Sequence, residues 1–186
     1  QNTPDTDPAL VQNREWMDGI IARIPKSSLG ISQAKHAKVK TVADLDKILD
    51  KAVAAQAKWV ARPAEERADI LHKVGIELAL RRAELIEVAG AELGKTVGES
   101  DVEVSEAVDF AHYYAQQSLE LGNIEDATFE PATLTVVASP WNFPIAIPFG
   151  GVAAALAAGS AAVLKPATIA QRCAGIVMEA LYAGGV

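Results

Sequence analysis

The sequence predicts an α/β fold in which N-terminal helices precede the first β-α-β-α half of a Rossmann-like parallel sheet. Two short β-rich runs, 134–138 and 161–164, are separated by a small-residue helical stretch, and a second helical stretch follows them. Strands that alternate with helices in this way form parallel sheets. Upstream of the first run, apolar residues recur at three- and four-residue spacing, a pattern typical of helices.

The first forty residues are predicted to hold one helix and a linker. A rough apolar stripe covers residues 8–24, whereas residues 25–40 contain serines and a glycine and read as a linker. The next helix is expected to begin after Thr41. Thr41 and Asp44 can each accept a free first-turn amide, as in a variant of the capping box.

Two further helical segments are predicted before the first strand. Arg62-Pro63 ends the helix that follows Thr41 and begins another, because proline suits a first helical position. Helical faces then continue to Gly94. A third helix is expected at about 97–121, stopping at Gly122. Its predicted buried face consists of Val104, Val108, Ala111 and Ala115.

The C-terminal region is predicted to alternate strands and helices. The helix at 145–158 ends at Gly159, and the helix at 168–182 has Thr168 as its N-cap. The uncharged stretch 145–164 is long enough to cross a bilayer, but Pro148 and several glycines favour a buried helix, turn and strand. The chain ends where a third strand is expected, which suggests a truncated piece of a longer protein. The predicted divisions are an N-terminal helix and linker, a helical region, and the first part of an NAD(P)-binding domain, at 1–40, 41–129 and 130–186.

Composition narrows the function classes. Among 186 residues, 17 are basic and 24 acidic, which gives a formal net charge of -7. No basic cluster is present, so nucleic acid is not expected as a partner. The single cysteine excludes an internal disulfide and fits a reducing cytoplasm. The N-terminus has no apolar run, so neither a signal peptide nor a transmembrane segment is expected there.

The run Ser139-Pro140-Trp141-Asn142-Phe143-Pro144 follows the first strand and carries the main candidate site. Ligands in open α/β sheets bind beyond the carboxyl ends of strands. There the Asn142 amide could donate hydrogen bonds to a carbonyl oxygen that gains negative charge, as an oxyanion-hole element. The alternative is that Asn142 caps the following helix or forms an Asx turn.

The neighbours of Asn142 and a later lysine extend this candidate site. The two prolines pin the backbone, and Trp141 and Phe143 can wall an apolar pocket, although core aromatics would give the same composition. Lys165 ends the second strand and could donate to ribose hydroxyls or phosphate oxygens, or it could be an ordinary solvated lysine. Neither a G-x-G-x-x-G fingerprint nor a Walker loop occurs in the sequence.

Other reactive residue types are predicted to be structural. Cys173 has no base beside it in sequence and is expected to be an inert buried thiol. His36, His72 and His112 lie far apart without metal-ligand spacing, so no metal site is predicted. The acidic residues are scattered over helix faces and are interpreted as solvated charge.

Residues 136–165, VVASPWNFPIAIPFGGVAAALAAGSAAVLK, resemble the first strand, helix and second strand of an aldehyde dehydrogenase cofactor domain. Four upstream segments narrow this resemblance: NTPDTDP at 2–8, NREW at 13–16, EVSEAVDF at 103–110 and YYA at 113–115. They are similar to the 1-pyrroline-5-carboxylate dehydrogenase branch, particularly the form found in bifunctional proline utilization A proteins. The resemblance covers nearly the whole chain.

The resemblance implies oxidation of L-glutamate γ-semialdehyde to glutamate with NAD or NADP, without a metal. It assigns Asn142 as the oxyanion donor, Phe143 to the substrate, and Trp141 and Lys165 to the cofactor. Ser139, Pro140 and Thr168 complete the implied cofactor contacts. In the family a glutamate that holds ribose hydroxyls usually stands at the position of Thr168, and a neutral hydroxyl there would tolerate the 2′-phosphate of NADP.

The resemblance also implies partners. The family's cysteine nucleophile, catalytic glutamate and pyrophosphate-contacting glycine loop have no match within these residues. The chain alone is therefore expected to be inactive. Its expected partners are the small aldehyde substrate, the rest of the same polypeptide, which can include a proline dehydrogenase domain, and further copies in a homo-oligomer. The alternative is a non-catalytic interaction or regulatory module that keeps part of the fold.

Overall fold

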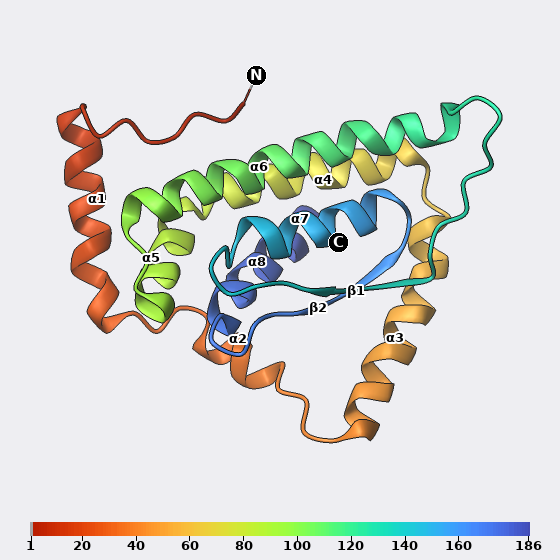
Figure 1. Ribbon diagram of the computed structural model, residues 1–186, viewed down its shortest axis with the longest axis horizontal. Coiled ribbons are helices and arrows are strands. Elements are labelled where there is room, and N and C mark those ends of the chain that lie inside the picture. Colours follow the sequence, from red (N-terminus) through yellow and green to blue (C-terminus); the bar gives the residue numbers. More distant parts are fainter. Residues whose placement is uncertain (1) are drawn as a thin grey trace.

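The computed structural model describes residues 2–186 and places most of the helices before a small sheet (Figure 1). The helical part consists of α1 (Val11–Arg23), η1 (Ile24–Lys26), α2 (Ile31–His36), α3 (Val42–Val60), α4 (Ala64–Leu80), α5 (Arg82–Leu93), α6 (Val97–Glu120) and η2 (Leu121–Asn123). The part that follows consists of β1 (Leu134–Ala138), α7 (Ala146–Ala157), β2 (Ala161–Lys165) and α8 (Gln171–Gly184). The predicted α/β class and the β-α-β-α order are confirmed.

The two strands pair in parallel. Their register runs from Leu134 opposite Ala161 to Ala138 opposite Lys165. The predicted strands are therefore correct, with one residue added to the end of the second. Because the two strands are parallel and their ends are aligned, the chain leaves both strands on the same side of the sheet. We call this side, where the carboxyl ends of the strands lie, the edge of the sheet. Figure 1 shows this edge on the side of the molecule where α5 and α2 lie.

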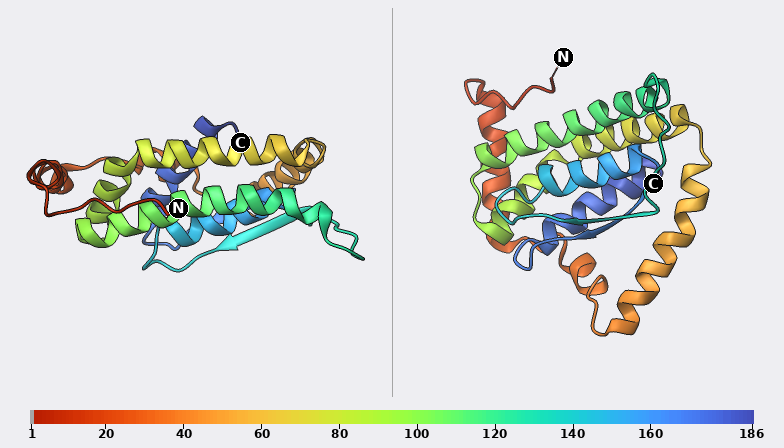
Figure 2. Two further views of the ribbon diagram at one scale, coloured as in Figure 1. Left: turned by 90° about the horizontal axis from the view of Figure 1, so that it is seen from above. Right: turned by 45° about the vertical axis from the view of Figure 1, so that its right-hand side comes forward.

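Helix α7 lies between the sheet and α6, and two adjacent glycines allow this close packing. A Cβ added at Gly150 would lie 2.8 Å from the ring of Phe110 in α6, and one at Gly151 would lie 2.7 Å from Val137 in β1. Any side chain at either position would push α7 away from a neighbour. The view from above in Figure 2 shows the strands along one side, with α7, α6 and α4 behind them.

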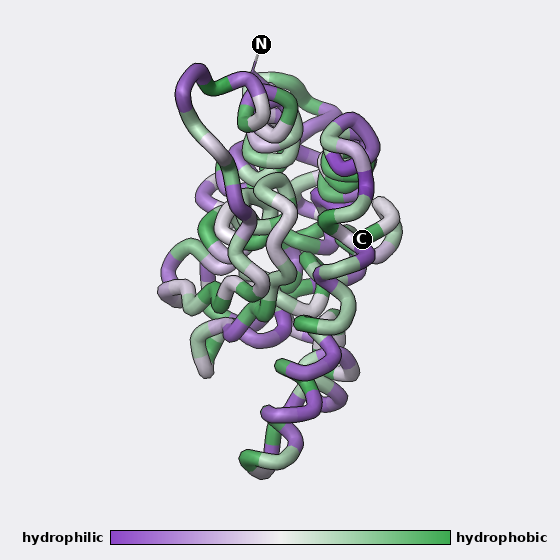
Figure 3. Tube along the Cα trace, turned by 90° about the vertical axis from the view of Figure 1, so that its right-hand side faces the viewer, coloured by the Kyte–Doolittle hydropathy of each residue, from purple (hydrophilic) through white to green (hydrophobic). Residues whose placement is uncertain are grey.

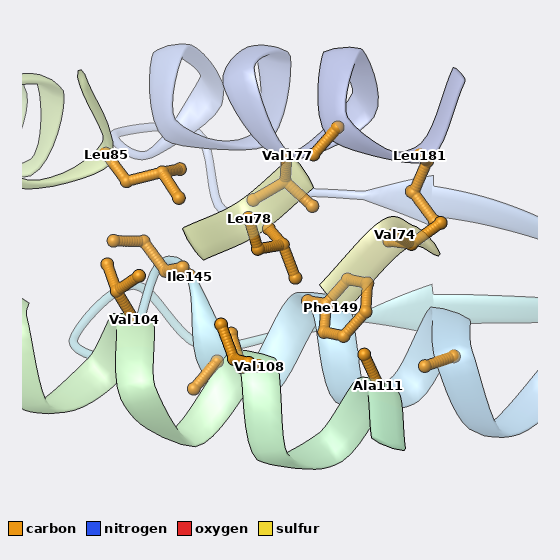
Figure 4. Packing of buried hydrophobic residues seen from close by; sticks show 14 of the residues in the cluster. Val74, Leu78, Leu85, Val104, Val108, Ala111, Ile145, Phe149, Val177 and Leu181 are labelled. Atoms are coloured by element: carbon orange, nitrogen blue, oxygen red, sulfur yellow. The ribbon is translucent and has the colours of Figure 1, made fainter. Parts of the chain in front are cut away.

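The hydrophobic core lies between α4, α6, α7 and α8, whose apolar faces meet in Figure 4. Phe149 of α7 is completely buried there. The face predicted for α6 is confirmed, since Val104, Val108, Ala111 and Ala115 are all buried. This packing ties the helix that follows β1 to the long helices upstream in the sequence.

Side-chain caps define the starts of two upstream helices. Thr41 and Asp44 form the predicted capping box at the start of α3. A second capping box, formed by Thr96 and Glu99, begins α6. Gly94 ends α5 with a φ of 71°, a left-handed conformation that glycine adopts without strain.

The prediction that residues 25–40 form a linker is wrong. Part of this segment is helical, as η1 and α2, and it packs on α8. The guanidinium of Arg172 in α8 donates hydrogen bonds to the carbonyls of Leu29 and Ser27, at 2.8 and 3.0 Å. The helix α2 has six residues and buries none of them, so its sequence carries no periodic apolar signal.

The predicted start of the last helix is also wrong. Helix α8 begins at Gln171, three residues after Thr168, and its N-cap residue has no side-chain cap bond. The carboxylate of Glu92 in α5 instead accepts the amides of Arg172 and Cys173, at 2.8 and 2.9 Å. The carboxylate of Glu92, which is remote in sequence, thus caps α8 in place of the Thr168 hydroxyl that was predicted to do so.

The N-terminal part of helix α3 extends away from the core, and no residue of α3 is buried (Figure 3). Several of its apolar side chains are exposed, namely Val42, Leu45, Ile48 and Val53. The uncharged stretch 145–164 forms α7, a turn and most of β2, as predicted. Among residues 2–186, no helix combines the length and apolarity needed to cross a membrane.

Candidate functional site

The paired strand ends bring the sequence-predicted site residues to one edge of the sheet. Lys165 is the last residue of β2 and pairs with Ala138, from which the chain enters the Asn142 turn. Asn142, Lys165 and Thr168 are all exposed at this edge. The side chains of Trp141 and Phe143 are 54% and 45% exposed. These residues are therefore open to a ligand that approaches the carboxyl ends of the strands.

Asn142 does not cap helix α7. The N-cap position of α7 is Ile145, and no local side chain caps it. Its first amides are bound by Glu103 of α6, whose Oε2 accepts the Ile145 and Ala146 N–H groups at 2.5 and 3.1 Å. The capping alternative for Asn142 is therefore wrong. Within residues 2–186 its carboxamide has no hydrogen-bond partner and remains available to a ligand.

A largely buried ion pair lies directly behind this turn. The Nζ of Lys95 is 2.5 Å from Oε1 of Glu103, and the two side chains are 14% and 1% exposed. The same Nζ donates to the backbone carbonyl of Asn142 at 2.9 Å and lies 5.0 Å from the centre of the Phe143 ring. The Glu103 carboxylate also faces the positive N-terminal end of α7, an attractive arrangement of charge and helix dipole.

Ile145, the N-cap residue of α7, also fixes the end of the turn through its packing. Ile145 is completely buried, and Figure 4 shows its side chain beside that of Val104 in α6. One turn of α6 thus contributes both Val104, which packs against Ile145, and Glu103, which binds its amide. Packing and hydrogen bonding together fix the point at which the Asn142 turn enters α7.

The interpretation of the acidic residues as solvated charge is wrong for the following three, all of which are buried: Glu87, Asp101 and Glu103. Each forms an ion pair, respectively with Arg23, Arg82 and Lys95. A signal for Glu103 exists in the sequence. It starts a row at four-residue spacing that continues with Ala107, Ala111 and Ala115, all completely buried. A carboxylate in such a row faces the interior and needs partners there.

Cys173 has the properties of an inert thiol, as predicted. It is completely buried in the first turn of α8. Burial, and then the negative charge of Glu92, raise the pKa of the Cys173 thiol far above its ordinary value. Because the thiolate is the reactive form, this cysteine cannot serve as the nucleophile at neutral pH.

The structure brings two of the histidines together. Nδ1 of His72 in α4 lies 2.7 Å from Nδ1 of His112 in α6, although 40 positions separate them. Burial, and then the neighbouring His72, lower the pKa of His112. His36 lies apart and contacts Ser32. Among residues 2–186 no group of three potential metal ligands occurs, so the pair stands without a third ligand.

The exposed polar groups at this edge can donate hydrogen bonds to a ligand that carries oxygen acceptors. Asn142 offers a free amide donor, Lys165 offers an ammonium group, and Thr168 offers a hydroxyl, all without a competing carboxylate on the same loops. The aromatic side chains of Trp141 and Phe143 can cover the apolar part of a ligand. Ser139 is half-buried and Pro140 exposed in the connecting segment.

Comparison with known proteins identifies relatives of this chain. Residues 28–186 match the Aldehyde dehydrogenase family. The chain is 40% identical to an alpha-ketoglutarate semialdehyde dehydrogenase of Haloferax volcanii, over 70% of this chain and 29% of that protein. It is 38% identical to the bifunctional protein PutA of Escherichia coli, over 87% of this chain and 12% of that protein. A 1-pyrroline-5-carboxylate dehydrogenase of Bacillus mycoides is 34% identical over 76% of this chain and 29% of its own length.

Solved structures show the same fold. Proline utilization A from Corynebacterium freiburgense matches 99% of this chain with a TM-score of 0.80 and 39% identity, over 18% of that chain. A 1-pyrroline-5-carboxylate dehydrogenase from Thermus with bound NAD matches all of this chain with a TM-score of 0.86 and 24% identity, over 43% of its length. The latter likeness concerns the fold alone. This chain therefore spans less than half the length of each of these relatives.

Proposed function

The chain belongs to the aldehyde dehydrogenase family, and from this membership we propose that it is the N-terminal part of a 1-pyrroline-5-carboxylate dehydrogenase of proline catabolism. The proposed reaction oxidises L-glutamate γ-semialdehyde to glutamate. An aldehyde, water and NAD(P)⁺ become a carboxylate, NAD(P)H and two protons. The observation that carries the proposal is the exposed Asn142 turn at the shared edge of the two strands.

Asn142 has the role of polarising the aldehyde. Its amide donates a hydrogen bond to the carbonyl oxygen, which gains negative charge when a nucleophile adds to the carbon. Phe143 covers the aliphatic part of the substrate. The nucleophile is proposed to be a cysteine outside these residues, because Cys173 is buried and its pKa is raised.

Trp141, Lys165 and Thr168 have the role of holding the cofactor, with Ser139 and Pro140 in the connecting segment. When bound, NAD(P) accepts the hydride that leaves the aldehyde carbon. The donors present fit its ribose, since Lys165 at the end of β2 and Thr168 beyond it are both exposed. Thr168 carries no negative charge, so NADP is proposed to be accepted as well as NAD.

A second substrate is favoured by one comparison. The relative from Haloferax volcanii is named as acting on α-ketoglutarate semialdehyde, and it is 40% identical over 141 residues. Both candidate substrates are short semialdehydes that carry a carboxylate. We favour the proline-derived semialdehyde because the PutA match extends over more of this chain, 87% against 70%. The proposed location is the cytoplasm.

The test is a turnover assay of the complete gene product that contains this chain. Each semialdehyde is supplied with NAD or NADP, and reduced cofactor is followed by its absorbance. The proposal expects the highest kcat/KM with L-glutamate γ-semialdehyde and no turnover by residues 1–186 alone. A gene product that folds but oxidises neither semialdehyde would favour the non-catalytic module. A preference for α-ketoglutarate semialdehyde would reassign the substrate.

A further inference from the structure

Two charged residues, Lys95 and Glu103, contact the Asn142 turn on the side that faces the protein interior. Lys95 follows the end of α5, and Glu103 lies in the second turn of α6. We infer that this pair consists of positioning residues, which set the direction of the Asn142 carboxamide for aldehyde oxidation. The inference rests on the proposed function and adds residues to which neither the family resemblance nor the motif at 139–144 gives a role.

Glu103 fixes the end of the turn. Its Oε2 accepts the amides of Ile145 and Ala146, while its Oε1 is held by Lys95. The two amide contacts are buried, so water cannot replace either amide without entering the core. The carboxylate therefore anchors the first residues of α7 to α6.

Lys95 fixes the middle of the turn. Its ammonium group donates to the Asn142 carbonyl at 2.9 Å and lies 5.0 Å from the centre of the Phe143 ring, within cation–π range. The contact is to the backbone carbonyl of Asn142, and Asn142 itself is exposed. Restraining the peptide group orients the side chain that the same residue carries.

The pair cannot act on the substrate directly. The Lys95 and Glu103 side chains are only 14% and 1% exposed, whereas Asn142 is exposed. Any effect on catalysis must therefore pass through the turn. Position matters strongly for such a donor, because a misplacement of about 1 Å can cost roughly 100-fold in rate.

The first experiment measures Lys95→Met in the complete gene product, with L-glutamate γ-semialdehyde and NAD. Methionine keeps an unbranched side chain of similar length but cannot donate to the Asn142 carbonyl. We expect kcat to fall about 10- to 100-fold, within the range that misplacement causes. KM for NAD should change less than about threefold, because the cofactor contacts are elsewhere. An unchanged kcat would overturn the inference.

A neutral pair separates positioning from stability. Lys95→Met alone leaves a buried carboxylate without its cation, which lowers stability. In the double variant Lys95→Met/Glu103→Gln the charge is gone, and the glutamine oxygen can still accept a helix amide. The thermal midpoint should recover relative to Lys95→Met, while kcat should stay low. A kcat that recovers together with the midpoint would show that the pair serves stability alone.

Arg82→Met provides the matched control. The Arg82–Asp101 ion pair also joins the α5 region to a buried carboxylate in α6, with side chains 15% and 3% exposed. It lies outside the Asn142 turn. Arg82→Met should lower the thermal midpoint by a similar amount to Lys95→Met and leave kcat within about threefold of the parent protein. An equal loss of kcat in both variants would contradict a specific role for Lys95.

A double-mutant cycle tests whether Lys95 acts through Asn142. In an Asn142→Ala background, Lys95→Met should lower kcat by less than about threefold further, because the group it orients is missing. Full multiplication of the two single effects would overturn the inference. Failure of the proposed function can be distinguished from failure of this inference. In the first case the parent protein itself would oxidise neither semialdehyde, so no kcat could be compared among the variants.

Discussion

The helices that follow the two strands begin in the same way but have different surroundings. Neither α7 nor α8 has a local side-chain cap, and in each a carboxylate from an upstream helix accepts the first amides. Glu103 of α6 binds the start of α7, and Glu92 of α5 binds the start of α8. Only Glu103 forms an ion pair with a lysine that also contacts the turn after the strand.

This difference separates a structural device from a functional one. A remote carboxylate joins each strand-following helix to the helical region, which stabilises the packing of sequence segments that lie far apart. At α7 the carboxylate is linked through Lys95 to the backbone carbonyl of Asn142, whose residue is exposed. At α8 the adjacent side chain is the buried Cys173, which offers no group to a ligand. The two helix starts therefore serve as internal controls for each other.

The largest effect on stability is expected for Glu103→Ala. It removes two buried amide contacts and the carboxylate partner of the largely buried Lys95, so the free energy of unfolding should fall by about 3–5 kcal/mol. Glu92→Ala removes a cap without such an ion pair and should cost about 0.5–2 kcal/mol. Urea denaturation of the 186-residue chain measures both. Equal losses in the free energy of unfolding would contradict the proposed difference between the starts of α7 and α8.

The next largest effect is expected for Asn142→Ala. Losing one donor to a developing oxyanion typically lowers kcat about 100- to 1000-fold, while an exposed side chain contributes little to folding. Steady-state kinetics of the complete gene product measure the change. Glu92→Gln is the control at the other helix start, and it should leave kcat within about threefold. A similar kcat loss in both variants would remove the functional distinction between the two ends.

A smaller effect is expected when α7 itself is displaced. In Gly150→Ala the added Cβ would lie 2.8 Å from the Phe110 ring, so α7 or the ring must shift, at a cost of about 1–3 kcal/mol. At Gly98 in α6 an added Cβ meets nothing within 4 Å. Gly98→Ala should therefore stabilise the chain by about 0.5–1 kcal/mol. Chemical denaturation distinguishes the two, and a stabilised Gly150→Ala variant would contradict the close packing of α7.

The smallest effect concerns the start of α8. Burial and the Glu92 charge raise the pKa of Cys173, so iodoacetamide should alkylate it at pH 8 far more slowly than a free thiol. Glu92→Gln removes the negative charge, which is the smaller of these two causes, and should speed alkylation only slightly. Mass spectrometry at timed intervals measures both rates. Rapid labelling of the parent chain would show that Cys173 is accessible as a thiolate.

The features that could be predicted from the sequence depend on local patterns. The strand 134–138, the Thr41 capping box and the end of α7 at Gly159 each have a signal within a few residues. The parallel pairing followed from the alternation of strands and helices, and it placed Asn142 and Lys165 at one edge as expected.

The features that were missed depend on contacts between distant segments. Glu103 and Ile145 are 42 positions apart, and Glu92 and Arg172 are 80 apart, so no local pattern connects either carboxylate to the helix it caps. The incorrect assignment of Thr168 as a cap has the same origin. His72 and His112 meet only because α4 packs along α6.

One measurement tests the central claim most directly: a crystal structure of the complete gene product with an unreactive analogue of L-glutamate γ-semialdehyde bound. The account predicts that the Asn142 amide nitrogen lies about 2.7–3.1 Å from the analogue's carbonyl oxygen. Lys95 should still contact the Asn142 carbonyl in that structure. A carboxamide turned away from the analogue, or an analogue bound away from the ends of β1 and β2, would contradict the account.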